Sequence, residues 1–256
     1  MSVLESFILG LVQGLTEFLP VSSSGHTVIA GKLLGLPQVP MAFELTVHLA
    51  SLLSVIIVLR KQVFEIIKKP LGRDMRLIIV ATLPSALIVL LFKSFFEAAF
   101  SGEYLIYCFL ITAMLLIISG SVRPKMIKPE ISYFDAIVIG MAQGVAALPG
   151  ISRSGSTIST AKMLGNSAEN STRFSFLISI PIIIGSAVFE FITNDSALGI
   201  GVLPLCVGFT AAFLSGLFGA ALMTKIFSRR SLDGFAIYLF LLSVFLLCND
   251  LFLGIF

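Results

Sequence analysis

Charged side chains are scarce in this sequence. Asp, Glu, Lys and Arg make up only 12% of its 256 residues, whereas hydrophobic residues make up 57%. Soluble domains carry about 25% charged residues, so this composition excludes a soluble globular fold. Together with a mean hydropathy of +1.05, it predicts a polytopic membrane protein.

Cysteine is also rare, and the start of the chain lacks a basic segment. The three cysteines, Cys108, Cys206 and Cys248, all lie within apolar runs, which predicts buried packing rather than a disulfide or a metal site. The opening residues MSVLESF include Glu5 but neither lysine nor arginine. We therefore do not expect a cleaved signal peptide.

Two similar polar segments interrupt the apolar sequence. Residues 13–35 read QGLTEFLPVSSSGHTVIAGKLLG, and residues 143–165 read QGVAALPGISRSGSTISTAKMLG. Each places a proline, a small-residue turn and several hydroxyls where an apolar helix would otherwise continue. This arrangement predicts a polar group held at depth in the membrane. Residues that match at the same offset are Gln13, Gly14, Gly25, Thr27, Lys32, Leu34 and Gly35, with Gln143, Gly144, Gly155, Thr157, Lys162, Leu164 and Gly165.

The two copies differ at the positions that carry chemistry. Glu17 of the first copy faces Ala147 of the second, and His26 aligns with Ser156. Arg153 of the second copy aligns near a serine of the first. One copy therefore supplies a carboxylate and an imidazole, and the other supplies a guanidinium.

Three apolar runs of membrane length follow each copy. Each approaches the ~20 residues that a helix needs to cross the hydrocarbon. The polar copies are broken at a proline into pieces too short to span, and such backbone is tolerated at depth only where protein or water covers it. We predict that residues 2–36 and 132–165 form re-entrant helical hairpins. The apolar runs are residues 41–59, 74–92 and 104–120 in the first half, and 171–192, 200–227 and 234–256 in the second.

These patterns predict an all-α integral membrane fold with a single domain over residues 1–256. A hairpin that returns to its own side adds no crossing, so each half crosses three times and the second half is inverted relative to the first. The first repeat covers residues 1–120, and the second covers residues 131–256. Inverted repeats of this kind bring the two hairpin tips together near the midplane.

The distribution of lysine and arginine predicts the orientation. The more basic side faces the cytoplasm by the positive-inside rule, so we expect both termini and the mouth of the first hairpin outside. Because the charge encodes topology, the pI of 8.8 does not indicate a nucleic-acid partner. The opposite side has only Lys32 and Lys93. The cytoplasmic set comprises Arg60, Lys61, Lys68, Lys69, Arg73, Arg76, Arg123, Lys125, Lys128, Lys162, Arg173, Lys225, Arg229 and Arg230.

Gln13 and Glu17 lie four residues apart and share a helix face just before the first proline. A carboxylate at membrane depth is costly and indicates a functional site. The alternative is a glutamate that reaches the interface or bonds the backbone where the helix breaks. Glu44 and His48 have the same spacing. They suit metal ligands or a partly wet helix face, and we rank them as secondary candidates.

Ser22, Ser23 and Ser24 precede Gly25 and His26 at the start of a short predicted helix. Serines at such a position cap free amides, and exposed helix N-termini also bind anions. With His26 adjacent, one serine can act as a nucleophile with a neighbouring base, or the imidazole can itself take a phosphoryl group. These residues alone do not decide between a serine and His26 as the nucleophile.

Ser152, Arg153 and Ser154 form the matching turn of the second copy, followed by Gly155 and Thr157. An arginine deep in hydrocarbon is expensive unless it faces an anion, and its planar fork binds phosphate oxygens in pairs. The alternative is an internal ion pair with the carboxylate of the first copy. Both roles are compatible if a substrate displaces part of the pair.

Opposing turns with these side chains suit a phosphate or a diphosphate. Phosphoryl transfer needs mainly positioning and charge neutralisation, which hydroxyls, an imidazole and an arginine supply. A divalent cation that bridges Glu17 and phosphate oxygens would neutralise charge that one arginine cannot.

At these residues the sequence resembles the undecaprenyl-diphosphatase family, integral-membrane phosphatases associated with bacitracin resistance. The resemblance rests on GLTEFLPVSSSGH at 14–26, PGISRSGSTIS at 149–159 and RFSFLISIP at 173–181, and it extends over essentially the whole chain. It implies an inverted repeat with two re-entrant hairpins in the bacterial cytoplasmic membrane. It also implies removal of the terminal phosphate of undecaprenyl diphosphate on the outer face, which recycles the carrier lipid for cell-wall synthesis.

The resemblance further implies the roles of individual residues. The functional carboxylate, serine, histidine and arginine of the family fall on Glu17, Ser23, His26 and Arg153, with a divalent cation, magnesium or else calcium. Gln13 stands where the family often has glutamate, so Gln13 and Glu17 are candidate metal ligands with one carboxylate between them. We expect the remaining turn residues to bind substrate: Ser22, Ser24, Gly25, Ser152, Ser154, Gly155 and Thr157.

Of two other functions considered for these residues, one lacks a required residue and the other remains an alternative. A type-2 phosphatidic acid phosphatase needs a second histidine after its serine–arginine pair, and no histidine follows Arg153. A lipid-phosphate flippase or anion transporter is the alternative function, because inverted repeats with broken helices also serve alternating access. A nucleophile, base and carboxylate in one turn argue against transport alone. The sequence carries no signal for an oligomeric state.

Overall fold

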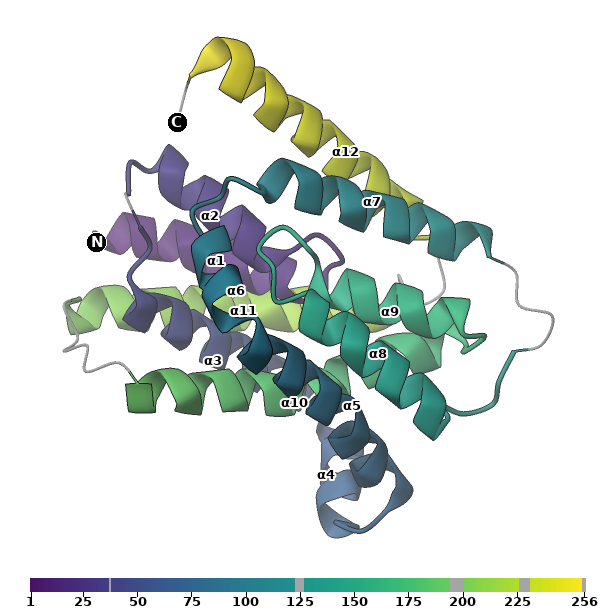
Figure 1. Ribbon diagram of the computed structural model, residues 1–256. Coiled ribbons are helices and arrows are strands. Elements are labelled where there is room, and N and C mark those ends of the chain that lie inside the picture. The colour runs from purple at the N-terminus through teal and green to yellow at the C-terminus, as the bar shows by residue number, and fades with distance from the viewer. Residues whose placement is uncertain (37, 123–126, 194–199, 226–230, 255–256) are drawn as a thin grey trace.

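The computed structural model describes residues 1–36, 38–122, 127–193, 200–225 and 231–254 (Figure 1), with the side chains of 190–193 and 253 outside this description. Within these ranges the chain forms helices α1 to α12 and a π-helical turn at Asn249–Leu253. An isolated β-bridge joins Lys128 and Asn166. The all-α prediction is confirmed.

Each polar copy folds into two short helices joined by a turn. The first pair consists of α1 (Val3–Phe18) and α2 (Ser23–Leu33), and the second consists of α8 (Tyr133–Val145) and α9 (Arg153–Met163). Both pairs start in the same way, with a capping box in which a serine side chain and a carboxylate three residues later satisfy each other's amides. Ser2 pairs with Glu5 at the start of α1, and Ser132 pairs with Asp135 at the start of α8.

Five helices of the described residues are long and apolar enough to cross a membrane. They are α3 (Met41–Val58), α5 (Arg73–Leu91), α10 (Ala168–Thr193), α11 (Val202–Lys225) and α12 (Asp233–Cys248), which continues into the π-helical turn. The remaining predicted crossing is α7 (Leu105–Ser121), an apolar helix of only 17 residues. Two short helices in the connections were not predicted, α4 (Arg60–Lys68) and α6 (Lys93–Ala99).

The short helices of the hairpins pack against long helices through glycine. A Cβ added at Gly14 would lie 2.1 Å from Ser215 Oγ, so α1 rests directly on α11. A Cβ added at Gly140 would lie 2.1 Å from the carbonyl oxygen of Ala81, so α8 rests on α5 in the same manner. Small residues let membrane helices approach this closely, because no side chain separates the backbones.

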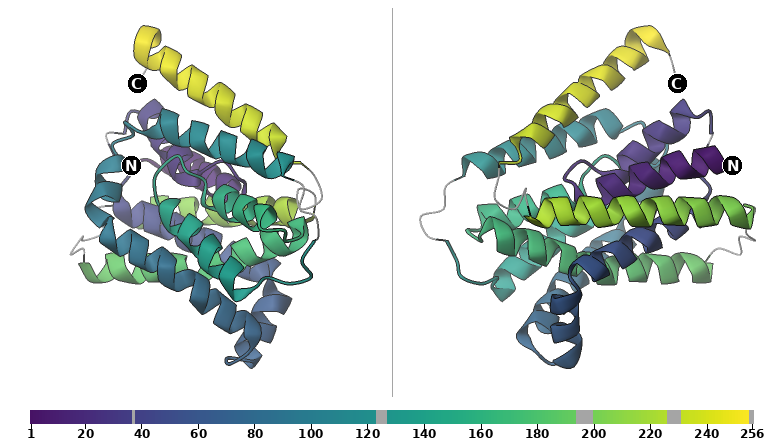
Figure 2. Two further views of the ribbon diagram at one scale, coloured as in Figure 1. Left: turned by 45° about the vertical axis from the view of Figure 1, so that its right-hand side comes forward. Right: turned by 180° about the vertical axis from the view of Figure 1, so that it is seen from behind.

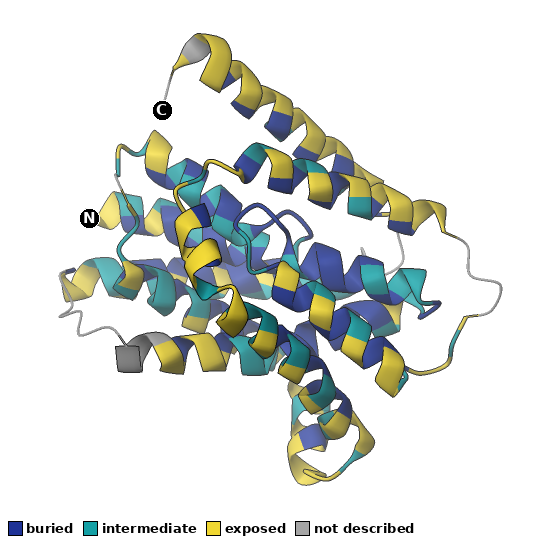
Figure 3. Ribbon diagram, viewed as in Figure 1, coloured by how far each residue is buried: buried dark blue, intermediate teal, exposed yellow. Residues whose placement is uncertain are grey.

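The molecule places apolar side chains outside and polar side chains inside. Leu83, Met114 and Phe218 are each more than 60% exposed, whereas Thr157 and Ser179 are fully buried. Figure 3 shows the outer faces of the long helices as mainly exposed and the centre as buried. This distribution suits a chain surrounded by lipid, since hydrocarbon solvates apolar side chains and polar groups must pair internally.

The cysteines follow this distribution only in part. Cys108 is buried, as predicted, but Cys206 and Cys248 are exposed, so the prediction of buried packing is wrong for these two. An apolar run is buried only where another helix covers it, and α11 and α12 each turn one face outward.

The start of α1 and the π-helical turn after α12 lie at one end of the helix bundle, and the end of α7 and the start of α8 lie at the other (Figure 1). Helix α12 packs mainly on α7 and diverges from the remaining helices toward its C-terminal end, as Figures 1 and 2 show. Four residues of the predicted cytoplasmic basic set lie outside the described residues: Arg123, Lys125, Arg229 and Arg230.

Candidate active site

The turns of the two hairpins meet in the middle of the bundle, where Figure 3 shows both as buried. The Gly150 N–H donates to Ser22 Oγ at 3.0 Å, and Ser154 Oγ donates to the Leu19 carbonyl at 2.9 Å. A Cβ added at Gly25 would come within 3.0 Å of Gly150 Cα. The polar residues of both copies therefore share one site, as the sequence predicts.

Ser22 shapes the first turn. Its φ of 69° makes it the only non-glycine residue with positive φ in the described part of the chain, a conformation that costs about 1–3 kcal/mol. Three interactions hold it in place. Its Oγ accepts from the Gly25 amide at 3.4 Å and from the Gly150 amide, and its carbonyl accepts from the His26 amide at 3.2 Å. Ser22 thus acts as the cap of α2 and as a link between the hairpins.

Glu17 is the centre of the site and is buried, with 6% of its surface exposed. Its Oε2 accepts hydrogen bonds from Gln13 Nε2 at 2.8 Å and from Ser23 Oγ at 2.5 Å, while its Oε1 accepts from Arg153 Nη2. The structure confirms the internal ion pair between Glu17 and Arg153. The alternative in which Glu17 reaches the interface is wrong, because the carboxylate is buried and accepts hydrogen bonds from three side chains inside the protein.

His26 makes its side-chain hydrogen bonds to groups other than Glu17. Its Nδ1 lies 2.7 Å from the Ser22 carbonyl oxygen, and its Nε2 lies 2.7 Å from the Tyr238 hydroxyl. Because a carbonyl only accepts, Nδ1 carries the proton and Nε2 is the free base of the neutral ring. Of the two candidate nucleophiles, Ser23 is therefore the one whose proton has a carboxylate acceptor within hydrogen-bond reach.

The second hairpin contributes one long side chain to the site and several short ones to its own turn. Ser152 Oγ caps α9 by accepting from the Gly155 amide at 3.0 Å and lies 3.3 Å from Ser154 Oγ. Thr157 Oγ1 bonds the Arg153 carbonyl at 2.8 Å and lies 2.6 Å from a serine of α10. These contacts stabilise the turn. Arg153 reaches across it to the Glu17 carboxylate of the first hairpin, whereas Ser154 reaches only the backbone of that hairpin. Ser24 likewise contacts the first turn, with its Oγ 3.3 Å from Ser22 Oγ.

Two residues of the site carry little or no signal in the sequence. His48, ranked as secondary, lies on α3 with its Nε2 4.0 Å from Glu17 Oε2, and its Nδ1 lies 2.8 Å from the Glu44 carbonyl. A histidine in an otherwise apolar run was the available signal. Tyr238 was not considered, because a tyrosine in an apolar helix is common and nothing nearby in the sequence distinguishes it.

A divalent cation fits this site only if its ligands are one protein carboxylate together with oxygens of the substrate. Within the described residues, no three side chains of His, Cys, Asp or Glu gather into a metal site. Gln13 directs its amide nitrogen at Glu17, and its oxygen accepts from Thr27 Oγ1 at 3.3 Å. Magnesium is often held by one or two carboxylates together with substrate phosphates, and Glu17 fits that arrangement.

A cavity of about 970 Å³ opens beside α2, between α2, α3, α5, α6 and α10. Its walls are largely apolar and include Val28, Val89, Phe96 and Ile182. Helix α2 carries Ser23 in its first turn and lines this cavity with later residues such as Val28. The cavity and the first hairpin turn are therefore joined by one short helix.

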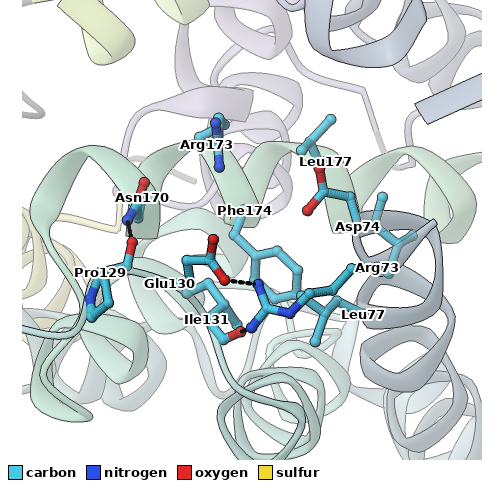
Figure 4. Close-up of a pocket in the computed structure, with 11 residues that line it drawn as sticks. Arg73, Asp74, Leu77, Pro129, Glu130, Ile131, Asn170, Arg173, Phe174 and Leu177 are labelled. Atoms are coloured by element: carbon cyan, nitrogen blue, oxygen red, sulfur yellow. Dashed lines mark hydrogen bonds and ion pairs between the residues drawn. The ribbon is translucent and has the colours of Figure 1, made fainter. Parts of the chain in front are cut away.

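A second polar cluster lies where α5, α8 and α10 begin. Arg73 forms an ion pair with Glu130 and donates to the Ile131 carbonyl at 2.7 Å. With Arg173 these residues line a cavity of about 160 Å³ (Figure 4). Arg173, which opens the third motif quoted above, therefore belongs to this cluster and not to the hairpin turns.

Fold and site together define a class: a helical integral-membrane protein that holds a carboxylate, an arginine and a serine between two internal hairpin turns. A family model described as bacitracin resistance protein BacA matches residues 6–245. The chain belongs to this family.

Individual relatives match over nearly the full length. An undecaprenyl-diphosphatase of Carboxydothermus hydrogenoformans is 46% identical over 255 residues, covering 96% of this chain and 97% of the relative. An undecaprenyl-diphosphatase of Christiangramia forsetii is 39% identical over 257 residues, covering 95% and 97%. One of Methanococcus maripaludis is 39% identical over 254 residues, covering 95% and 99%.

Proposed function

We propose that the chain hydrolyses undecaprenyl diphosphate to undecaprenyl phosphate and inorganic phosphate. The family and the names of its relatives support this activity. The observation that carries it is the contact of Ser23 Oγ with Glu17 Oε2 at 2.5 Å, beside Arg153 on the other carboxylate oxygen. A serine, its proton acceptor and an anion-binding cation are the parts that a phosphoryl transfer requires.

The reaction proceeds in two displacements. Ser23 Oγ attacks the terminal phosphorus while Glu17 accepts its proton, and the bridging P–O bond breaks so that undecaprenyl phosphate leaves with the bridging oxygen. Water then attacks the phosphoserine, its proton passes to His26 Nε2, and Ser23 Oγ regains the proton from Glu17. Inorganic phosphate is released, and loss of the proton from His26 restores the site.

Arg153 and the start of α2 neutralise charge on the transferring group. Because Arg153 is paired with Glu17 without substrate, a bound diphosphate competes with the carboxylate for the guanidinium, and Glu17 becomes the better base as it loses that partner. Magnesium, or calcium, would be held by Glu17 together with substrate oxygens, with Gln13 as a possible further ligand after its amide rotates. When bound, the cation supplies charge neutralisation.

The same proposal includes the membrane arrangement. The two halves form an inverted repeat, residues 1–120 and 131–256, in which residues 2–36 and 132–165 are re-entrant hairpins. The matched packing of α1 on α11 and of α8 on α5 supports this arrangement. The site faces the outer side of the bacterial cytoplasmic membrane, and the apolar cavity beside α2 has room for part of the prenyl chain.

The decisive experiment measures phosphate release from undecaprenyl diphosphate by detergent-purified protein, after chelation and again after addition of magnesium. We expect release by wild type with magnesium, and loss of about a hundredfold or more in Glu17→Gln because the base is gone. Glu65→Gln is the matched control, since Glu65 is exposed on α4. If wild type binds the lipid diphosphate but releases no phosphate with any cation, the phosphatase is wrong and a flippase or anion transporter replaces it.

A further inference from the structure

The hydrogen bond between His26 and Tyr238 joins the first hairpin to the last helix. The Tyr238 hydroxyl lies 2.7 Å from His26 Nε2, although 212 positions separate the two residues. Their rings are stacked, with centroids 5.6 Å apart and an interplanar angle of 17°. Phe109 meets the imidazole edge-on from α7, at a centroid distance of 5.5 Å. Two aromatic side chains and two hydrogen bonds therefore determine the orientation of the imidazole.

The hydrogen bonds also determine where the proton of the ring lies. The Ser22 carbonyl accepts from Nδ1, so the neutral ring presents a lone pair at Nε2, and the Tyr238 hydroxyl donates to it. Without that donor, only the hydrogen bond at Nδ1 and the packing of the two aromatic rings oppose rotation of the imidazole. Both ring nitrogens are therefore engaged. Nδ1–H stays on the Ser22 carbonyl, and Nε2 exchanges a proton during the reaction when the Tyr238 hydroxyl gives way to the attacking water.

We propose that Tyr238 is a positioning residue for His26, holding the ring as the Nδ1–H tautomer with Nε2 directed toward α12. This inference rests on the proposed phosphatase function, in which His26 Nε2 accepts the proton of the attacking water. Tyr238 contributes the orientation of that base, and α12 thereby becomes part of the active site although it packs mainly on α7.

The kinetic test replaces Tyr238 with phenylalanine, which removes the hydroxyl and retains the stacked ring. We expect kcat for phosphate release to fall about tenfold, the effect of losing one hydrogen bond to a working group, with KM changed by less than about twofold. Tyr107→Phe is the matched control, because Tyr107 is exposed on α7. We expect this substitution to change neither kcat nor KM. In a His26→Ala background, Tyr238→Phe should cause no further loss.

The spectroscopic test reads the ring directly. The chain has only two histidines, so ¹⁵N-histidine labelling of tag-free protein gives two imidazole patterns, and His48→Gln identifies which belongs to His26. We expect the Nδ1–H pattern for His26 in wild type, a changed Nε2 resonance in Tyr238→Phe, and an unchanged one in Tyr107→Phe.

Each outcome separates this proposal from the proposed function. Normal kcat in Tyr238→Phe, or a tenfold loss with an unaltered His26 spectrum, overturns the positioning role while the phosphatase stands. Wild-type protein that releases no phosphate overturns both, even if the hydrogen bond is seen in the spectrum.

Discussion

Glu17 and Arg153 compensate each other's charge in the interior of the protein. Each would be costly alone, because an ion moved from water into a low-dielectric region loses its hydration. The side chains of Glu17 and Arg153 are 4% and 17% exposed, so solvent does little to offset that cost. Ser23 and Gln13 supply the remaining donors to the carboxylate. The same side chains that make the site chemically active therefore also contribute to folding stability.

Replacing one partner of this ion pair should affect activity and stability together. In Arg153→Ala we expect phosphate release to fall by about a hundredfold or more, and the folded state to lose about 3–5 kcal/mol because Glu17 is left unpaired. Thermal unfolding in detergent and phosphate release measure the two effects.

The matched variant is the double substitution Glu17→Gln with Arg153→Ala, which removes both charges. It should recover much of the stability and none of the activity. An Arg153→Ala protein with near-normal turnover would contradict the assigned role of the guanidinium.

At the scale of helices, the site depends on how closely the hairpin helices approach their supports. Gly14 lies on the helix α1 that carries Glu17, and Gly140 lies on α8, which leads to the turn before Arg153. Any side chain at these positions would push a hairpin helix away from α11 or α5, because backbone atoms occupy the space. The position of the two turns relative to each other is therefore set by glycine packing away from the turns.

Alanine at these glycines should destabilise the fold. We expect Gly14→Ala and Gly140→Ala each to lower the free energy of unfolding by about 1–3 kcal/mol through overpacking. The control is Gly185→Ala on α10, where no atom lies within 4 Å of the added Cβ and alanine favours the helix. Melting temperatures in detergent compare the three, and equal values for Gly14→Ala and Gly185→Ala would show that the α1–α11 contact is not tight.

At the scale of the whole molecule, the proposal predicts which connections face which side of the membrane. In the proposed orientation, the turn after α6 shares the outward side with the termini, and the connection between α4 and α5 faces the cytoplasm. In a cysteine-free background, a membrane-impermeant maleimide should label Ser101→Cys in intact cells. Lys69→Cys should be labelled only after the cells are opened, and the reverse pattern would invert the proposed orientation.

The sequence by itself determined the class of fold and most of the elements. The apolar runs after each polar copy became α3, α5, α7, α10, α11 and α12 within a few residues, because the length and hydropathy of a membrane helix are local properties. The helix breaks near Pro20 and Pro149 were also readable, because each proline comes with a turn of small and hydroxyl residues. Proline alone does not end a helix here, since Pro84 and Pro181 lie inside α5 and α10. The helices α4 and α6 escaped prediction because they have only nine and seven residues, which is shorter than the stretch over which helical periodicity can be recognised.

The tertiary structure alone decided which side chains work together. From the sequence, the choice between Ser23 and His26 as nucleophile stayed open. The packing placed Ser23 on Glu17 and turned His26 toward Tyr238. It also brought His48 to within 4.0 Å of the carboxylate. Such contacts depend on the rotation and separation of helices far apart in the chain. Those are fixed by close packing at residues such as Gly14, and no local pattern of residues encodes them.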